Sequence, residues 1–261
     1  MPISEDDSPD DTCSGAAAGG FQDLDQIQDR IEAFLRESLP LCVMYLPGIA
    51  DGSIKIRSEK ELAVSVCKRL KAVADDRATL FTFFNEDPDV REKGRTDDMS
   101  VLPSVGMAYL KVGAHYYDCE EQLYIIEAKR LPTPSRAGQG DRSREYVVSD
   151  WDCRNSPKKR RRGGIERFKE GLHGQVFVRS AMVGFIQREA PDFWLAKVNS
   201  WIDELIANPI PCHTARWNED DLLFPVVGRS AGSRLSEFRS KHLRSGGADH
   251  MTLRHYWLML R

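Results

Sequence analysis

The chain has 261 residues, of which 41% are hydrophobic and 30% charged, so it is long enough for one large domain with a substantial core. The formal net charge of −3 gives no overall attraction to a polyanion, and no apolar run approaches the roughly 18 residues that a transmembrane helix needs. The first twenty residues contain acids and small residues but no base. They predict a disordered acidic tail over 1–20, unlike a signal peptide, followed by a single domain over 21–261 in a cytoplasmic protein.

The cysteines show no metal-binding or disulfide spacing. No two of them form a CxxC pair, which fits reduced thiols and argues against a structural zinc ion. Cys212 beside His213 is a lone pair, and such a pair is more often packing than ligation. The six cysteines are Cys13, Cys42, Cys67, Cys119, Cys153 and Cys212.

Apolar spacing and turn residues predict an alternation of helices and strands. In chain order we expect a helix over 23–39, strands at 41–46 and 53–57, a helix over 58–76, strands at 79–84 and 97–102, an extended segment over 106–117 and a strand over 123–131. After a long loop over 132–163 we expect a helix over 163–174, a strand within 175–188, a helix over 190–208, and then strand, helix and strand at 222–227, 233–243 and 251–260. This order is typical of an α/β fold with a mixed central β-sheet flanked by helices.

The segment 123–131, "LYIIEAKRL", combines the composition of a buried strand with two charged residues. Residues i and i+2 of a strand share a face, so Glu127 and Lys129 project together. Burying two charges costs several kcal/mol. Proteins retain such buried charges where they hold a metal ion, neutralise each other or face a reaction cleft. The pair is therefore a candidate functional site.

A second acidic position precedes the neighbouring strand. "GRTDDMSVL" places Asp97 and Asp98 at its start, where adjacent strands can bring them to Glu127 and Lys129. Carboxylate oxygens are the ligands that Mg²⁺ and Mn²⁺ prefer. An ion held there could polarise a phosphate and activate water, while Lys129 orients the nucleophile or stabilises charge on phosphorus.

These residues resemble the PD-(D/E)xK, or restriction-endonuclease-like, nucleases, over about residues 58–187. The family pattern is an acid opening one strand, (D/E)xK on the next, a Glu on the preceding helix and often a Gln on the following one. No proline precedes the acid here, and the doubled acid leaves its identity open between Asp97 and Asp98, with Asp98 favoured because it directly abuts "MSVL". The matching residues are Glu59 or Glu61, Asp97 or Asp98, Glu127 with Lys129, and Gln175.

The resemblance implies a core of order αβββαβ with N- and C-terminal additions, and a Mg²⁺- or Mn²⁺-dependent nuclease. We expect it to cut DNA, as an endonuclease in restriction or anti-phage defence. The implied catalytic residues are Asp98, Glu127, Lys129 and Gln175. The implied metal ligands are Asp97, Asp98, Glu127, Glu59 and Glu61.

A basic run between the charged strand and the next helix is a candidate contact for the phosphate backbone. Its alternative is an ordinary solvated loop. The expected nucleic-acid contacts are Lys158, Lys159, Arg160, Arg161, Arg162 and Arg167. Supporting contacts would be Lys169, Lys241, His242 and Arg244.

Cutting both DNA strands takes two active sites in such folds, so we expect a homodimer or a larger defence complex with a regulatory partner, and no membrane association. Two other functions stay open. "GRSAG" places Ser230 in the G-x-S-x-G pattern of a serine hydrolase, between a predicted strand and a predicted helix. The third hypothesis is a nucleic-acid-binding module without catalysis.

Overall fold

The computed structural model describes residues 23–46, 58–85, 98–104, 110–117, 121–131, 143–148, 163–175, 177–211, 213–226, 233–245 and 250–260. The helices are α1 (Leu24–Met44), α2 (Glu59–Asp76), α3 (Gly164–Lys169), α4 (Pro191–Ala207) and the 3₁₀ turn η1 (Glu219–Asp221). The strands are β1 (Phe81–Asn85), β2 (Asp98–Pro103), β3 (Leu110–Val112), β4 (His115–Tyr117), β5 (Tyr124–Leu131), β6 (Arg179–Ile186), β7 (Phe224–Pro225), β8 (Leu235–Leu243) and β9 (His250–Met259).

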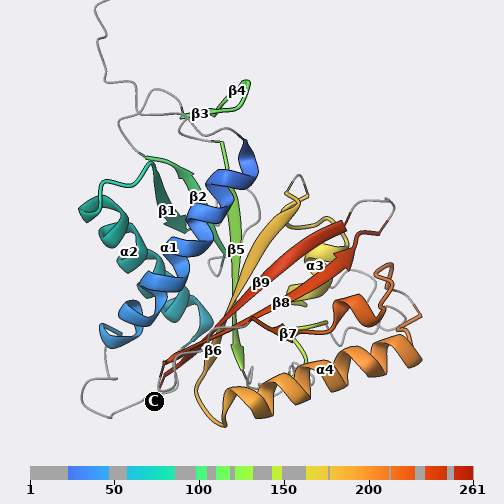
Figure 1. Ribbon diagram of the computed structural model, residues 1–261. Helices are drawn as coiled ribbons and strands as arrows, with labels where there is room; N and C mark the ends of the chain where they lie inside the picture. The colour runs from blue at the N-terminus through green and yellow to red at the C-terminus, as the bar shows by residue number, and fades with distance from the viewer. Residues whose placement is uncertain are drawn as a thin grey trace, which may run out of the picture.

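A seven-stranded mixed sheet forms the centre of the fold, in the order β1-β2-β5-β6-β9-β8-β7. Its middle is parallel, because β5 pairs with β6 and β6 with β9 in the same direction. The pairs β1 with β2, β2 with β5, β8 with β9 and β7 with β8 are antiparallel. β3 and β4 form a separate two-stranded hairpin beyond one end of the sheet (Figure 1). The predicted class, a mixed central sheet flanked by helices, is confirmed.

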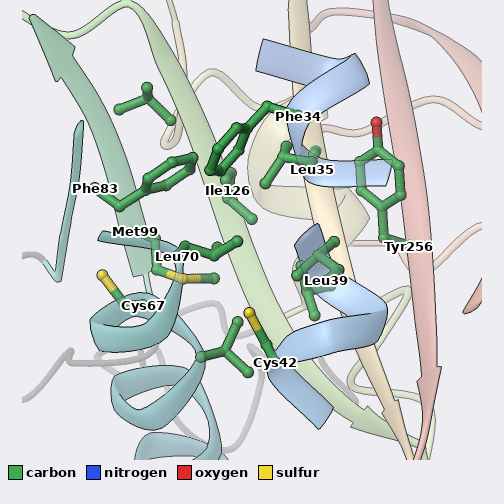
Figure 2. Packing of buried hydrophobic residues seen from close by; sticks show 14 of the residues in the cluster. Phe34, Leu35, Leu39, Cys42, Cys67, Leu70, Phe83, Met99, Ile126 and Tyr256 are labelled. Atoms are coloured by element: carbon green, nitrogen blue, oxygen red, sulfur yellow. The ribbon is translucent and has the colours of Figure 1, made fainter. Parts of the chain in front are cut away.

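Helices α1 and α2 cover one face of the sheet (Figure 1). Figure 2 shows side chains of α1, such as Phe34 and Leu39, meeting Leu70 of α2 and the strand residues Met99 and Ile126. All of these are buried. The opposite face packs against α3 and α4, whose buried members include Phe168, Val198 and Trp201.

Two predicted elements were wrong in type. Residues 41–46, expected as a strand, continue α1 through Met44, because Cys42 and Val43 extend its buried stripe past Pro40. Residues 233–243, expected as a helix, form β8. Its even positions Ser236, Phe238, Ser240 and His242 are all buried. Three of these four are polar, so no alternating apolar pattern announced the strand.

Several predicted segments lie outside the described residues: the tail over 1–20, the strand at 53–57 and the basic part of the loop over 132–163. The single-domain assignment over 21–261 stays a prediction. The remaining predicted helices and strands are found close to their expected positions.

Candidate functional site

The pairing of β2 with β5 places Asp98 directly opposite Glu127. Their neighbours Met99 and Ile126 point into the core beneath α1 and α2. Because side chains alternate along a strand, Asp98, Glu127 and Lys129 project from the other face, toward α3. Asp98 is 2% exposed, Glu127 0% and Lys129 3%.

The N-terminus of α2 supplies a third carboxylate. Ser58 caps this helix in a reciprocal hydrogen-bonded pair with Glu61, which accounts for Glu61 without any ligand role. Glu59 instead faces the site. Its carboxylate accepts from Lys129 Nζ at 3.2 Å and from the backbone N–H of Arg130 at 2.9 Å, so it fixes both the Lys129 ammonium and the adjoining strand.

Helix α3 places a guanidinium between the two facing acids. Arg167 Nη1 donates to Glu127 Oε1 at 3.0 Å, and Nη2 lies 3.4 Å from Asp98 Oδ2. Burial alone would lower the pKa of Arg167, but the charges of Glu127 and Asp98 outweigh it and raise that pKa. Arg167 is therefore a fixed cation that neutralises the acids. At 4% exposure it does not have the open position expected of a backbone-gripping residue.

His173 joins the site from the turn that follows α3. Gly171 and Gly174 take left-handed φ values of 68° and 59° and fold this turn back over the sheet. The ring packs edge-on against Phe168, with centroids 4.9 Å apart. His173 Nδ1 lies 3.4 Å from Arg167 Nη2 and 3.8 Å from Asp98 Oδ2.

Asp98, Glu127 and His173 together have the composition of a metal centre. Each offers a ligand atom, and the three atoms lie within 4.8 Å of one another. In addition, Asp98 Oδ1, Glu127 Oε2 and His173 Nε2 are buried without a hydrogen-bond partner among the described residues. Unsatisfied buried polar atoms are costly, and a bound ion is one of their ordinary explanations. The residues therefore fit a divalent cation.

Other predicted residues lie elsewhere. The Gln175 side chain is exposed, and its backbone carbonyl accepts from Arg244. Lys169 and His242 are fully buried and so do not form the supporting nucleic-acid surface, whereas Lys241 is exposed. Outside the described residues lie Asp97, Ser230 and the basic run Lys158, Lys159, Arg160, Arg161 and Arg162.

Two members of the site were missed or misassigned from sequence. His173 was passed over in "HGQ" in favour of Gln175, although its place between two turn glycines was the available signal. Arg167 was assigned to phosphate binding because it follows the basic run. Its position in α3, with Ile165 and Phe168 in the core, was the sign that it lies inside.

A second buried polar group runs beside the site as a hydrogen-bonded chain. Lys169 Nζ and His242 Nδ1 each lie 2.5 Å from Asp221 Oδ1. Ser240 Oγ lies 2.6 Å from His242 Nε2 and 2.7 Å from His255 Nε2. Tyr146 and Trp257 complete the chain, with Tyr146 Oη 2.8 Å from His255 Nδ1 and 2.8 Å from Trp257 Nε1.

The two ends of this hydrogen-bonded chain determine which atom donates the proton in each of its hydrogen bonds. Trp257 can donate but not accept, and the Asp221 carboxylate can accept but not donate. Every hydrogen bond is then satisfied if Tyr146 donates to His255, His255 to Ser240, Ser240 to His242 and His242 to Asp221, with both imidazoles neutral. Burial lowers the pKa of His242 despite the opposing pull of Asp221, and burial next to His242 lowers that of His255 well below its ordinary value.

We therefore expect acid to destabilise the fold through His242 and His255. Below about pH 6.5 the unfolded chain protonates these imidazoles while the folded chain does not, so stability falls by about 1.4 kcal/mol per pH unit for each. Urea unfolding at pH 7.5, 6.5 and 5.5 measures this slope. His255→Gln should remove about one imidazole's share, and a variant of the exposed His250, His250→Gln, should remove none. An unchanged slope in His255→Gln would contradict the assignment.

The serine-hydrolase alternative requires a helix after Ser230, but the structure has strand β8 there. A nucleophile elbow lies between a strand and a helix, but the segment carrying Ser230 connects the antiparallel strands β7 and β8. His255, one of the histidines that follow Ser230 in sequence, is buried in the hydrogen-bonded chain described above. The described residues do place Ser240, His242 and Asp221 in the order of a catalytic triad. Ser240 Oγ, however, also accepts a hydrogen bond from the second imidazole, His255, in the proton arrangement given above.

No family model, no curated protein and no solved structure matches the chain. Within the described ranges, none of the helices has the length and apolar character that a membrane crossing would take.

Proposed function

We propose that the protein is a metal-dependent nuclease that hydrolyses phosphodiester bonds of DNA. The observation that carries the proposal is the pairing of Asp98 with Glu127 across β2 and β5, with Lys129 two residues further on the same face. Each acid keeps one buried oxygen without a hydrogen-bond partner among the described residues. This is the arrangement that an acid opening one strand and (D/E)xK on the next would produce.

The order of elements supports the same proposal. α2, β1, β2, β5, α3 and β6 follow one another in the order αβββαβ, with the β3-β4 hairpin between β2 and β5. Glu59 sits on the helix that precedes the three strands, as in the PD-(D/E)xK pattern. The long separation of Asp98 from Glu127 in sequence is taken up in part by that hairpin.

Each residue has a defined task under this proposal. Asp98 and Glu127 would hold the cation, which when bound supplies Lewis-acid polarisation of a phosphate oxygen and a bound water of lowered pKa. Lys129, held by Glu59 and Glu127 at 3.2 Å each, keeps its ammonium fixed to orient the attacking water or stabilise charge on phosphorus. Gln175 is not given a role, because its side chain is exposed.

Plasmid cleavage tests the proposal. Supercoiled DNA, linear DNA and RNA are incubated with the protein and Mg²⁺, Mn²⁺ or EDTA. We expect DNA cleavage that EDTA abolishes. Lys129→Met should lower the rate at least about a hundredfold, because it removes a positioned group that acts in the transition state.

Lys60→Met is the matched control, because Lys60 is an exposed lysine of α2 near the same site. Both variants are checked for folding by thermal melting before assay. Binding of DNA without cleavage by any preparation would favour the non-catalytic module. Cleavage that persists in EDTA would refute the metal dependence.

The wider setting is part of the proposal. We propose endonuclease action in restriction or anti-phage defence, as a homodimer or in a complex with a regulatory partner, with the basic run at 158–162 gripping the phosphate backbone. Cys42 and Cys67 support a reducing, cytoplasmic location. Both are buried free thiols, and burial raises the pKa of each to about 12.

A further inference from the structure

We propose that the site binds a single divalent first-row transition-metal ion in preference to Mg²⁺, with His173 as its third protein ligand and with Mn²⁺ as the experimental probe. This inference rests on the proposed function, because it concerns the same metal site. The inference goes beyond the proposed function by naming the ligand set, the number of ions and the class of metal.

The ligand chemistry argues for a transition metal. Mg²⁺ prefers oxygen ligands and keeps several of its waters, whereas imidazole nitrogen suits transition metals better. His173 places a nitrogen ligand beside two carboxylates, with all three ligand atoms within 4.8 Å of one another. The three residues are 7%, 2% and 0% exposed, so the site has little contact with the solvent that a well-hydrated ion would retain.

The position of Arg167 leaves His173 and Asp98 available to bind a metal ion. The contacts of its Nη2 with Asp98 Oδ2 and with His173 Nδ1 are both 3.4 Å, long for such hydrogen bonds, while Nη1 to Glu127 Oε1 is 3.0 Å. Arg167 can therefore keep its hydrogen bond to Glu127 while an ion takes a nitrogen of His173 and an oxygen from each acid.

The same contacts limit the site to one ion. Glu127 Oε1 already serves both Lys129 and Arg167, at 3.2 and 3.0 Å, which leaves Oε2 as its free oxygen. The cluster contains three carboxylates and two fixed cations, so one divalent ion already reverses its net charge. A second ion would add like charge at a buried position, where repulsion is poorly screened.

Metal binding is measured directly on the chelator-stripped full chain. Calorimetric titrations with MnCl₂ and MgCl₂ give affinity and stoichiometry, and electron-spin-echo spectroscopy of bound Mn²⁺ detects a coordinated nitrogen. We expect one Mn²⁺ per chain, a nitrogen coupling, and Mn²⁺ affinity at least about tenfold above that of Mg²⁺.

His173→Gln is the decisive variant, because its amide presents an oxygen in place of the ring nitrogen. We expect it to lose the nitrogen coupling and to lower Mn²⁺ affinity by about tenfold or more while Mg²⁺ affinity changes less. His250→Gln, which alters an exposed histidine, should behave as wild type. Melting curves establish that each variant is folded.

The outcomes separate this inference from the proposed function. Equal affinity for the two metals, two Mn²⁺ ions per chain, or a nitrogen coupling that survives in His173→Gln would overturn the inference, even if DNA is cleaved. One nitrogen-ligated Mn²⁺ in a protein that cleaves no nucleic acid would uphold the metal site and refute the nuclease proposal. Absence of any metal binding would refute both.

Discussion

Arg167→Met is expected to destabilise the metal-free protein by about 3–5 kcal/mol, because it removes the cation from a buried, hydrogen-bonded ion pair. Arg167 Nη1 is 3.0 Å from Glu127 and Nη2 is 3.4 Å from Asp98, and these two acids face each other across β2 and β5. Without the guanidinium, the two carboxylates repel each other where little solvent screens them. Urea denaturation in the presence of EDTA measures the loss.

Mn²⁺ should reverse part of that loss. An ion that binds the folded chain alone stabilises it by about 2.7 kcal/mol at a hundred times its dissociation constant, and in the variant it also replaces the missing positive charge. The gain from Mn²⁺ should therefore be larger in Arg167→Met than in wild type. Arg216→Met, a change at an exposed arginine, should show neither effect. A variant as stable as wild type in EDTA would show that Arg167 does not neutralise the acids.

Asp221→Asn should also cost about 3–5 kcal/mol, because it leaves the buried ammonium of Lys169 without its partner. Lys169 and Asp221 are each 0% exposed, and Nζ is 2.5 Å from Oδ1. Burial lowers the pKa of Lys169 against the raising effect of Asp221, so without that carboxylate the pKa should fall further. Thermal and urea unfolding at pH 7.5 give the change in free energy.

A double-mutant cycle separates the lost pair from other damage. Lys169→Met combined with Asp221→Asn removes both charges, so the double variant should be more stable than the sum of the two single changes predicts. Asp203→Asn, at an exposed aspartate of α4, is the control. If the two single losses simply add, the ion pair is not what holds α3 against η1.

The elements that could be predicted from sequence were those whose apolar pattern decides their environment. α2 shows both a capping box at Ser58 and an apolar stripe, and β5 is a short apolar run, so both were predicted. β8 was not. Its buried face includes Ser240 and His242, which form hydrogen bonds with His255 and Asp221, and a local pattern cannot reveal partners that lie elsewhere in the chain.

The site divides in the same way. Glu127 and Lys129 stood out because charges are rare in a buried strand, and Asp98 followed from its place at the start of a strand. The register that sets Asp98 opposite Glu127 is a property of the folded sheet. So are the contributions of Arg167 and His173, which depend on how α3 and the following turn pack. Their residue types are common on surfaces, so the turn glycines beside His173 and the apolar neighbours of Arg167 were weak signals on their own.

The burial of Asp98, Glu127 and His173 affects the rate of metal exchange as well as the affinity of the site. Groups with 2%, 0% and 7% of their surface exposed meet solvent mainly when the structure opens locally. The rate at which a bound ion dissociates could then not exceed the rate at which the turn at 171–174 separates from the sheet, whatever the intrinsic ligand-exchange rate of the metal. Exchange of the bound ion would then follow the rate at which this turn opens, and both loading and chelation of the site should be slow.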